Sequence, residues 1–524
     1  MSHPTVLMAE RDPDVTGISI DAPVQSYDHQ HQAFQPRRDY TSRSAIDRLA
    51  GAQSLDNNAL LATLGLVSWQ NGAYVRTTPY TGNDIGVAVV DSGVGQNHTD
   101  LNAVSVFDAR NNVVVKATRA DGYGHGTHVS GLIGSNGFFS AGAYRGVAPG
   151  VRFIEMRVLD DNGQGYTSDV INAINYVVAN KNTLRVGVIN LSLGHPIYEP
   201  AATDPLVQAV ERAVAKGIVV VVAAGNFGGD PTTHATAYAG ITSPGNAPSA
   251  ITVGATETYQ TARRRDDVVA WFSSRGPTWY DGFQKPDLVA PGSHLISNID
   301  STSTICREYP GGVITPGPKP YFKMSGTSMA APVVSGIVAA MLEASLKNGA
   351  ALTPNAVKAI LQYTAIPLVN QDVLTQGAGE VNAAGAVALA AAVDPKAAVG
   401  QWWVATGVNA YSVIAGDTLL WGQRVVWGDR VVWGDQVYQN DPAWALRVVW
   451  GDRVVWGDRV VWGDSTVWDG NQLTWGTRVI WGDSLLGLTD GARVIWGDLT
   501  GLSIAPTALS WGNLERANGD LVGK

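Results

Sequence analysis

Short runs of valine, isoleucine and alanine alternate with longer amphipathic stretches from residue 83 onward. The apolar runs include VAVVD, VGVINL and IVVVVAA, and the stretches between them include SDVINAINYVVANK and DPLVQAVERAVAKG. Continuous apolar strands separated by helices are typical of a parallel sheet that helices cover on both faces. The pattern therefore predicts an α/β domain with a mostly parallel sheet, which ends near residues 377–393.

A different pattern follows this domain. From Trp421 to Trp511 the chain carries 12 of its 17 tryptophans, in repeats such as RVVWGDRVVWGD. Val, Trp and Ile favour strands and Gly-Asp favours a tight turn. Hairpins closed by Gly-Asp would leave no clean apolar face, whereas an even period of six keeps each side chain on the same face of a solenoid. We expect a linker at 396–415 and a β-rich, solenoid-like repeat region at 416–524, with a disordered tail as the alternative.

Composition excludes several classes of protein. The chain has 524 residues, of which 45% are apolar, so it can form one large core and a further unit. Its formal net charge of -9 provides no basic surface for nucleic acid. The single cysteine, Cys306, excludes an intramolecular disulfide and a cysteine-based zinc site, and we assign it no role. No uninterrupted apolar run of about 18 residues occurs, so we expect no membrane span.

One serine lies in an unusual setting. Ser328 occurs in SGTSMAAP, between small residues, where an apolar helical run begins. A hydroxyl at this position is often only a helix cap, because it accepts a hydrogen bond from an unpaired backbone N–H. The other interpretation is a nucleophile at a helix N-terminus, where small neighbours admit a substrate carbonyl and the helix dipole favours an oxyanion.

Three polar residues provide the partners that such a nucleophile needs. Asp91 ends the strand VAVVD, Asn226 follows the strand VVVVAA, and His125 begins the helix in GHGTHVSG. Catalytic groups gather at the carboxyl ends of parallel strands. Each residue alone has an ordinary structural explanation, as a turn, cap or core residue. Together they supply the groups for acyl transfer: an imidazole base, a carboxylate that orients it, and an amide donor for an oxyanion.

The order of these residues indicates a family. The motifs VAVVDSGV, GHGTHVSG, VINLSLG, VVAAGN and SGTSMAAP resemble those of the subtilisin-like serine proteases, the subtilases of peptidase family S8, over about residues 80–393. The resemblance implies that Ser328 is the nucleophile, His125 the general base and then acid, Asp91 its orienting partner, and Asn226 an oxyanion donor. It also implies a groove that binds substrate as an extended strand. The residues expected to line this groove are Ser192, Leu193, Gly194, Ala224 and Gly225.

The chain departs from the family pattern at two places. His195 stands where the family usually has a second glycine, which affects the size of a substrate subsite. The N-terminal stretch LMAERDPDVTGISIDAPVQSY resembles only the end of a subtilase prodomain, and no signal peptide precedes it. We expect residues 1–36 to be a prodomain remnant and linker, 37–395 the catalytic domain, and processing to remove at least residues 1 to about 27. An upstream export signal would make the enzyme extracellular.

The leading hypothesis is a secreted serine endopeptidase that hydrolyses polypeptides through an acyl-enzyme. The alternative is a surface-binding or adhesion protein in which the tryptophan repeats carry the main role, and a self-associating tail is a third reading. No cofactor is expected for the chemistry. Structural calcium occurs in many subtilases, but the sequence contains no ligand set specific enough to name. His125 and His128 lack the HExxH pattern of zinc proteases, so we expect no catalytic metal.

Overall fold

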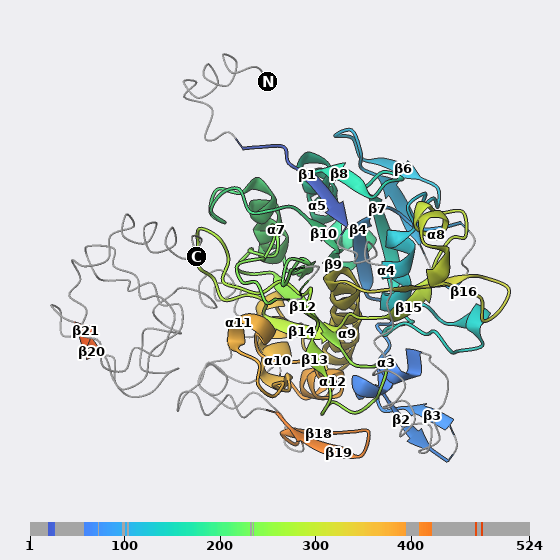
Figure 1. Ribbon diagram of the computed structural model, residues 1–524, viewed down its shortest axis with the longest axis vertical. Helices are drawn as coiled ribbons and strands as arrows, with labels where there is room; N and C mark the ends of the chain where they lie inside the picture. The colour runs from blue at the N-terminus through green and yellow to red at the C-terminus, as the bar shows by residue number, and fades with distance from the viewer. Residues whose placement is uncertain are drawn as a thin grey trace.

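The computed structural model describes residues 19–26, 57–71, 73–96, 100–101, 104–230, 233, 235–394, 408–421, 467–468 and 473–474. A nine-stranded sheet forms the centre of this part of the chain (Figure 1). Neighbouring strands run parallel from β14 to β5, and the short strands β6 and β13 are antiparallel. The strands are β4 (Gly86–Asp91), β5 (Ser105–Asp108), β6 (Val115–Ala117), β7 (Arg152–Arg157), β9 (Val186–Leu191), β11 (Val219–Ala223), β12 (Ile251–Glu257), β13 (Val268–Val269) and β14 (Leu288–Pro291).

Side-chain alternation along the strands produces two apolar layers. Val219 and Val221 belong to one core, and Val220 and Val222 belong to the other, because successive side chains of a strand point to opposite faces. Helices from different parts of the chain cover the two faces. The first core contains α4 (His125–Gly134), α9 (Thr327–Lys347), α10 (Pro354–Thr364) and α12 (Ala383–Ala391), and the second contains α5 (Thr167–Ala179) and α7 (Pro205–Ala215). The predicted α/β fold with a mostly parallel sheet covered on both faces is confirmed.

Helix α9 crosses the middle of the first core. Its composition and 21-residue length would allow it to span a membrane, but 94% of its most apolar window is buried inside the protein. Interspersed glycine, serine and threonine hide this helix from a search for uninterrupted apolar runs. The burial identifies it as the core helix of the domain, packed on β9, β11, β12 and β14.

The N-terminal strand β1 (Pro23–Ser26) lies on the α/β domain as the middle strand of a small antiparallel sheet. Its neighbours are β8 (Gln164–Tyr166) and β10 (Leu193–Gly194). Val24 is 1% exposed and belongs to the second apolar core. β1 therefore occupies the space between the edges of β8 and β10, which we call the groove, and Figure 1 shows the three strands side by side.

A hairpin that follows the α/β domain packs against it. Strands β18 (Tyr411–Ile414) and β19 (Asp417–Leu420) pair around a turn, and Asn382 at the start of α12 donates a hydrogen bond to Ser412 Oγ. This hairpin falls where the sequence predicts a linker and the start of the repeat region. The stretch TLLWGQ at 418–423 has the same arrangement of residues as the repeat RVVWGD. Beyond Trp421 only β20 (Val467–Trp468) and β21 (Leu473–Thr474) are described, so the solenoid and its alternatives lie outside the described residues.

Candidate active site

Asp91 and His125 form a buried pair. Asp91 is the last residue of β4, and His125 is the first residue of α4, which starts at the same edge of the sheet. The imidazole Nδ1 lies 2.8 and 3.0 Å from the two carboxylate oxygens, and both residues are 0% exposed. Gly126 allows this close approach, because a Cβ there would meet the backbone oxygen of Gly93 at 2.2 Å.

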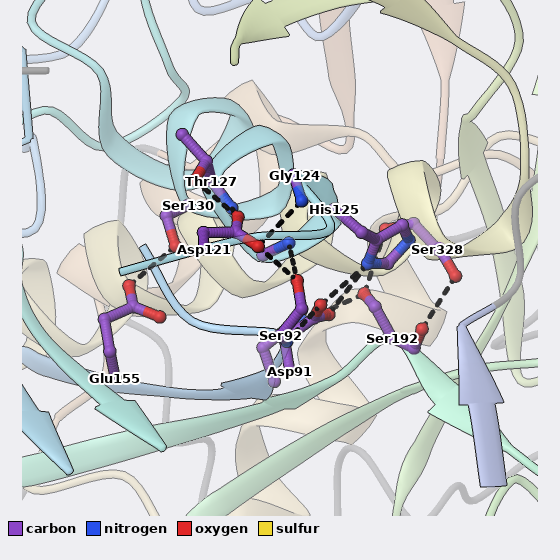
Figure 2. Close-up of polar contacts among 12 residues, drawn as sticks. Asp91, Ser92, Asp121, Gly124, His125, Thr127, Ser130, Glu155, Ser192 and Ser328 are labelled. Carbon is purple, nitrogen blue, oxygen red and sulfur yellow. Dashed lines mark hydrogen bonds and ion pairs between the residues drawn. The ribbon is translucent and has the colours of Figure 1, made fainter. Parts of the chain in front are cut away.

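Ser328 lies in the first turn of α9, on the other side of the imidazole from Asp91 (Figure 2). Its hydroxyl donates a hydrogen bond of 2.8 Å to the carbonyl of Ser192, and the hydroxyl of Ser192 donates one of 2.9 Å to the carbonyl of Ser328. This exchange joins the start of α9 to the segment that follows β9. The structure thus brings Asp91, His125 and Ser328 together from three elements that are distant in sequence.

Asn226 follows β11 and faces the start of α9. Its side-chain oxygen accepts hydrogen bonds from the backbone N–H and the hydroxyl of Thr327, at 3.0 and 3.1 Å. These bonds orient the amide, so that its Nδ2 is the atom left for another acceptor. That nitrogen is buried and has no hydrogen-bond partner among the residues that the structure describes. A buried N–H without a partner is costly, and a ligand oxygen at this point would satisfy it.

The residues expected to bind substrate divide into two groups. Leu193 and Gly194 pair with Ser26 and Gln25 of β1, so they form one wall of the filled groove. The other wall is β8, which the sequence reasoning missed. Ala224 and Gly225 do not pair with β1, and their carbonyls accept hydrogen bonds from Thr242 and Ser274 inside the domain. Ser192 lies between the groove and Ser328.

His195 continues the line of β10. Its backbone forms an antiparallel bridge with Ser243, and its ring stacks on Tyr198 with centroids 5.4 Å apart. The ring Nδ1 lies 2.7 Å from the carbonyl of Pro196. The residue that departs from the family pattern is therefore held in a fixed position at the end of the groove wall.

A second buried carboxylate connects Asp91 to the helix that carries His125. Asp121 accepts hydrogen bonds from Ser92 Oγ, from the backbone N–H groups of Gly124 and Thr127, and from Thr127 Oγ1. Burial raises the pKa of Asp121, and these hydrogen bonds oppose the shift. The signal in the sequence was an aspartate four residues before the histidine in DGYGH. Its role depends on the fold, because Ser92 lies on another element.

His128 faces the interior and does not join the site. Its Nε2 lies 3.0 Å from the carbonyl of Phe322, and burial together with the nearby His125 lowers its pKa to about 3. A neutral histidine packed in this way is structural. Within the described ranges, no group of three or more His, Cys, Asp or Glu side chains is arranged to hold a metal ion.

Two buried aspartates of the described part of the chain, Asp100 and Asp287, do not offer a calcium site. Calcium needs six to eight oxygen ligands, usually with several carboxylates. The buried Asp100 instead accepts hydrogen bonds from Tyr321 Oη, Asn298 Nδ2 and the backbone of Phe139. Asp287 similarly pairs with Lys285, whose ammonium group lies 2.8 Å away. These two carboxylates therefore already have protein partners.

Comparison with known proteins identifies the family of the chain. The Subtilase family matches residues 82–400. Serine protease AprX of Bacillus subtilis (strain 168) is 39% identical over 312 residues, which are 59% of this chain and 67% of AprX. Subtilisin of Bacillus pumilus is 35% identical over 266 residues, 50% of this chain and 78% of that protein.

The structure of fervidolysin from Fervidobacterium pennivorans, a keratinolytic enzyme related to subtilisin, matches with a TM-score of 0.47 and 28% identity over 59% of this chain. That match covers 43% of the fervidolysin chain, so this chain spans less than half of it. The chain belongs to the subtilase family and is a subtilisin-like serine protease.

Proposed function

We propose that the protein is an endopeptidase that cleaves polypeptides through an acyl-enzyme, with Asp91, His125 and Ser328 as its catalytic triad. The observation that supports this proposal is the buried pair of Asp91 and His125, with Ser328 on the far side of the imidazole ring. A carboxylate at Nδ1 fixes the tautomer in which Nε2 carries the lone pair, and that lone pair accepts the serine proton.

The reaction then proceeds in two halves. Ser328 Oγ leaves the carbonyl of Ser192, loses its proton to His125, and attacks the substrate carbonyl carbon. The carbonyl oxygen becomes an oxyanion that accepts a hydrogen bond from Asn226 Nδ2, which has no partner among the described residues. The peptide C–N bond breaks as His125 returns the proton to the leaving amine. Water then adds to the acyl-enzyme by the same steps and releases the acid.

The groove between β8 and β10 is the proposed substrate site. It holds β1 through antiparallel pairing on both edges, and such pairing recognises backbone rather than one side-chain sequence. Val24 fits into the apolar core beneath the groove, whereas Gln25 faces outward. We infer that substrates bind as β1 does, with an apolar side chain at the buried position.

The same register indicates where the N-terminal segment is cut. Gln25 pairs with Gly194 and Ser26 with Leu193, so the described strand runs toward Ser192. The carbonyl of Ser192 lies 2.8 Å from the hydroxyl of Ser328. We infer that the chain is cut just after β1, and the expected removal of residues 1 to about 27 makes the bond between Tyr27 and Asp28 the proposed processing site.

Labelling with a fluorophosphonate, which reacts with activated serines, tests the proposal. We expect labelling of the wild-type protein at Ser328 and none in Ser328→Ala. Asp91→Asn should fold but lose about four orders of magnitude in turnover, because the imidazole adopts the wrong tautomer. Labelling that persists in Ser328→Ala, or an Asp91→Asn variant with near-normal turnover, would remove the triad assignment.

An extracellular site of action and a surface-binding tail are further proposals. Both depend on sequence outside the described residues. Peptidase activity in the secreted fraction rather than the cell-associated fraction would support the first. Retention of the full chain on cell surfaces, with release of a chain that ends at residue 421, would support the second.

A further inference from the structure

A lone acidic residue lies in the middle of the buried strand β7. Glu155 pairs with Val89 of β4 and Val106 of β5 and is 0% exposed. Its Oε1 lies 2.7 Å from the hydroxyl of Ser130 on α4, the helix that begins with His125 (Figure 2). Its Oε2 has no hydrogen-bond partner among the described residues.

The surroundings of Glu155 are acidic. Asp91 at the end of β4, Asp121 before α4 and the cation Arg119 act on its charge, and α4 also carries His125 and His128. Burial raises the pKa of Glu155 well above its usual value, the two aspartates raise it further, and Ser130 and Arg119 only partly oppose them. A third buried carboxylate with one hydrogen bond is unfavourable, because its charge is neither hydrated nor paired.

We propose that Glu155 is a positioning residue that holds α4, and through it His125, as a neutral carboxylic acid, and that loss of its proton sets the alkaline limit of the protease. In the neutral form a hydrogen bond between Glu155 Oε1 and the hydroxyl of Ser130 holds α4 against β7. In the ionised form a negative charge lies beneath the pair of Asp91 and His125. This charge repels the carboxylates of Asp91 and Asp121, so the start of α4 and His125 lose the position that catalysis needs.

The proposed catalytic role of His125 underlies the activity part of this inference, whereas the protonation part can be measured in inactive protein. The sign of the effect on stability follows from the pKa. In the unfolded chain Glu155 ionises near its ordinary pKa of about 4.5, so folding at neutral pH takes up a proton. Stability therefore falls as pH rises from that value to the pKa in the folded protein. One proton corresponds to about a tenfold change in the unfolding constant per pH unit.

The first experiment measures this slope in the Ser328→Ala background, which prevents self-digestion. Unfolding by urea is compared with and without Glu155→Gln between about pH 6 and 9. The glutamine retains the hydrogen bond to Ser130 but does not titrate. We expect the unfolding constant of Glu155→Gln, relative to the parent, to fall progressively with pH. Identical pH slopes in the two proteins would overturn the proposal. Glu155→Met, a second replacement that does not titrate, gives the same test if Glu155→Gln fails to fold.

The second experiment measures activity with Ser328 present. Glu155→Gln should have a kcat within about twofold of wild type at neutral pH, and the alkaline decline of kcat should move to higher pH. Asp267→Asn is the matched control. Burial raises the pKa of Asp267 to about 10, but this residue lies beside Glu380 and next to β13, the edge strand at the other end of the sheet from β5 and β6. It should change the pH slope of stability without moving the decline of kcat. A decline that stays in place in Glu155→Gln, or moves equally in both variants, would overturn the positioning role.

Discussion

Asp21 holds the first turn of α5 through Ser168. Asp21 lies two residues before β1 begins. Its carboxylate oxygens accept hydrogen bonds of 2.9 Å from the backbone N–H and the hydroxyl of Ser168. The residue in the N-cap position of α5, Tyr166, provides no side-chain cap. A carboxylate at a helix N-terminus is favourable because it pairs with an unsatisfied N–H and with the positive end of the helix dipole. The N-terminal segment therefore supplies a cap that the catalytic domain lacks.

Asp21→Ala should slow cleavage of the N-terminal segment from its own chain. Loss of the cap, about 1 kcal/mol, would reduce occupancy of the groove by β1 and slow processing about fivefold. Mass spectrometry of freshly folded protein measures the rate of loss of residues 1–27. Glu308→Ala, at an exposed acidic residue of α8 (Thr304–Glu308), is the control and should process normally. Unchanged processing in Asp21→Ala would contradict the role of the cap.

Asn226→Ala should lower kcat by about 100-fold to 1,000-fold with little change in KM, the size of effect known for such a donor in subtilisin itself. The reason is that Nδ2 meets an acceptor only when the oxyanion forms. The same variant removes the bonds from Thr327, so a melting curve must show that α9 still begins normally. An equal loss in kcat/KM caused mainly by a raised KM would indicate ground-state binding instead.

The fold and the chemical groups of the site could be predicted from local sequence, whereas their supporting contacts could not. Apolar runs such as VVVVA report burial on both faces, and the edge where Asp91 and Asn226 emerge follows from parallel topology. The bond from Ser92 to Asp121 and the approach of Glu155 to Ser130 depend on how three elements pack. No spacing in the chain encodes such distances.

The local sequence pattern is also a misleading guide to burial at the N-terminal end of the domain. Val24 is in a polar, irregular N-terminal stretch, yet it is buried because the groove provides partners on both sides. Local patterns cannot report partner strands that lie 139 residues or more away in the sequence, as β8 and β10 do.

Glu343→Gln should destabilise the protein at neutral pH but not in acid. Glu343 on α9 accepts backbone N–H bonds from Thr81, Gly82 and Asn83, at 2.7, 2.8 and 3.1 Å. Burial alone would raise its pKa, but Lys347 and these amides outweigh burial and lower it. A lowered pKa contributes stability above the unfolded value, and this contribution is lost as pH falls through the folded value.

We expect Glu343→Gln to lower the free energy of unfolding by about 1.5 to 3 kcal/mol at pH 7, which is the usual contribution of a hydrogen bond to a charged group. Urea unfolding in the Ser328→Ala background measures it, and the difference between variant and parent should shrink below about pH 4.5. Glu308→Gln serves as the exposed control and should change neither curve. A difference that is constant from neutral to acid pH would show that charge plays no part in the anchor.

Trp421→Ala should destabilise the catalytic domain, although this tryptophan belongs to the repeat pattern. Trp421 is 4% exposed, its Nε1 donates to Ser412 Oγ at 3.1 Å, and its ring packs edge-on against Tyr363 at 5.6 Å. Replacing a buried aromatic side chain by alanine costs about 3 to 5 kcal/mol.

Trp427→Ala, at the next tryptophan six residues on, is the matched control. If the repeats beyond the hairpin form a separate unit, Trp427→Ala leaves unfolding of the catalytic domain unchanged. A chain that ends at residue 421 should then keep the small-peptide kcat of the full protein, whereas one that ends at 394 should unfold at lower urea. Equal destabilisation by both substitutions, or loss of peptide hydrolysis on truncation after 421, would show that the tail is part of the catalytic fold.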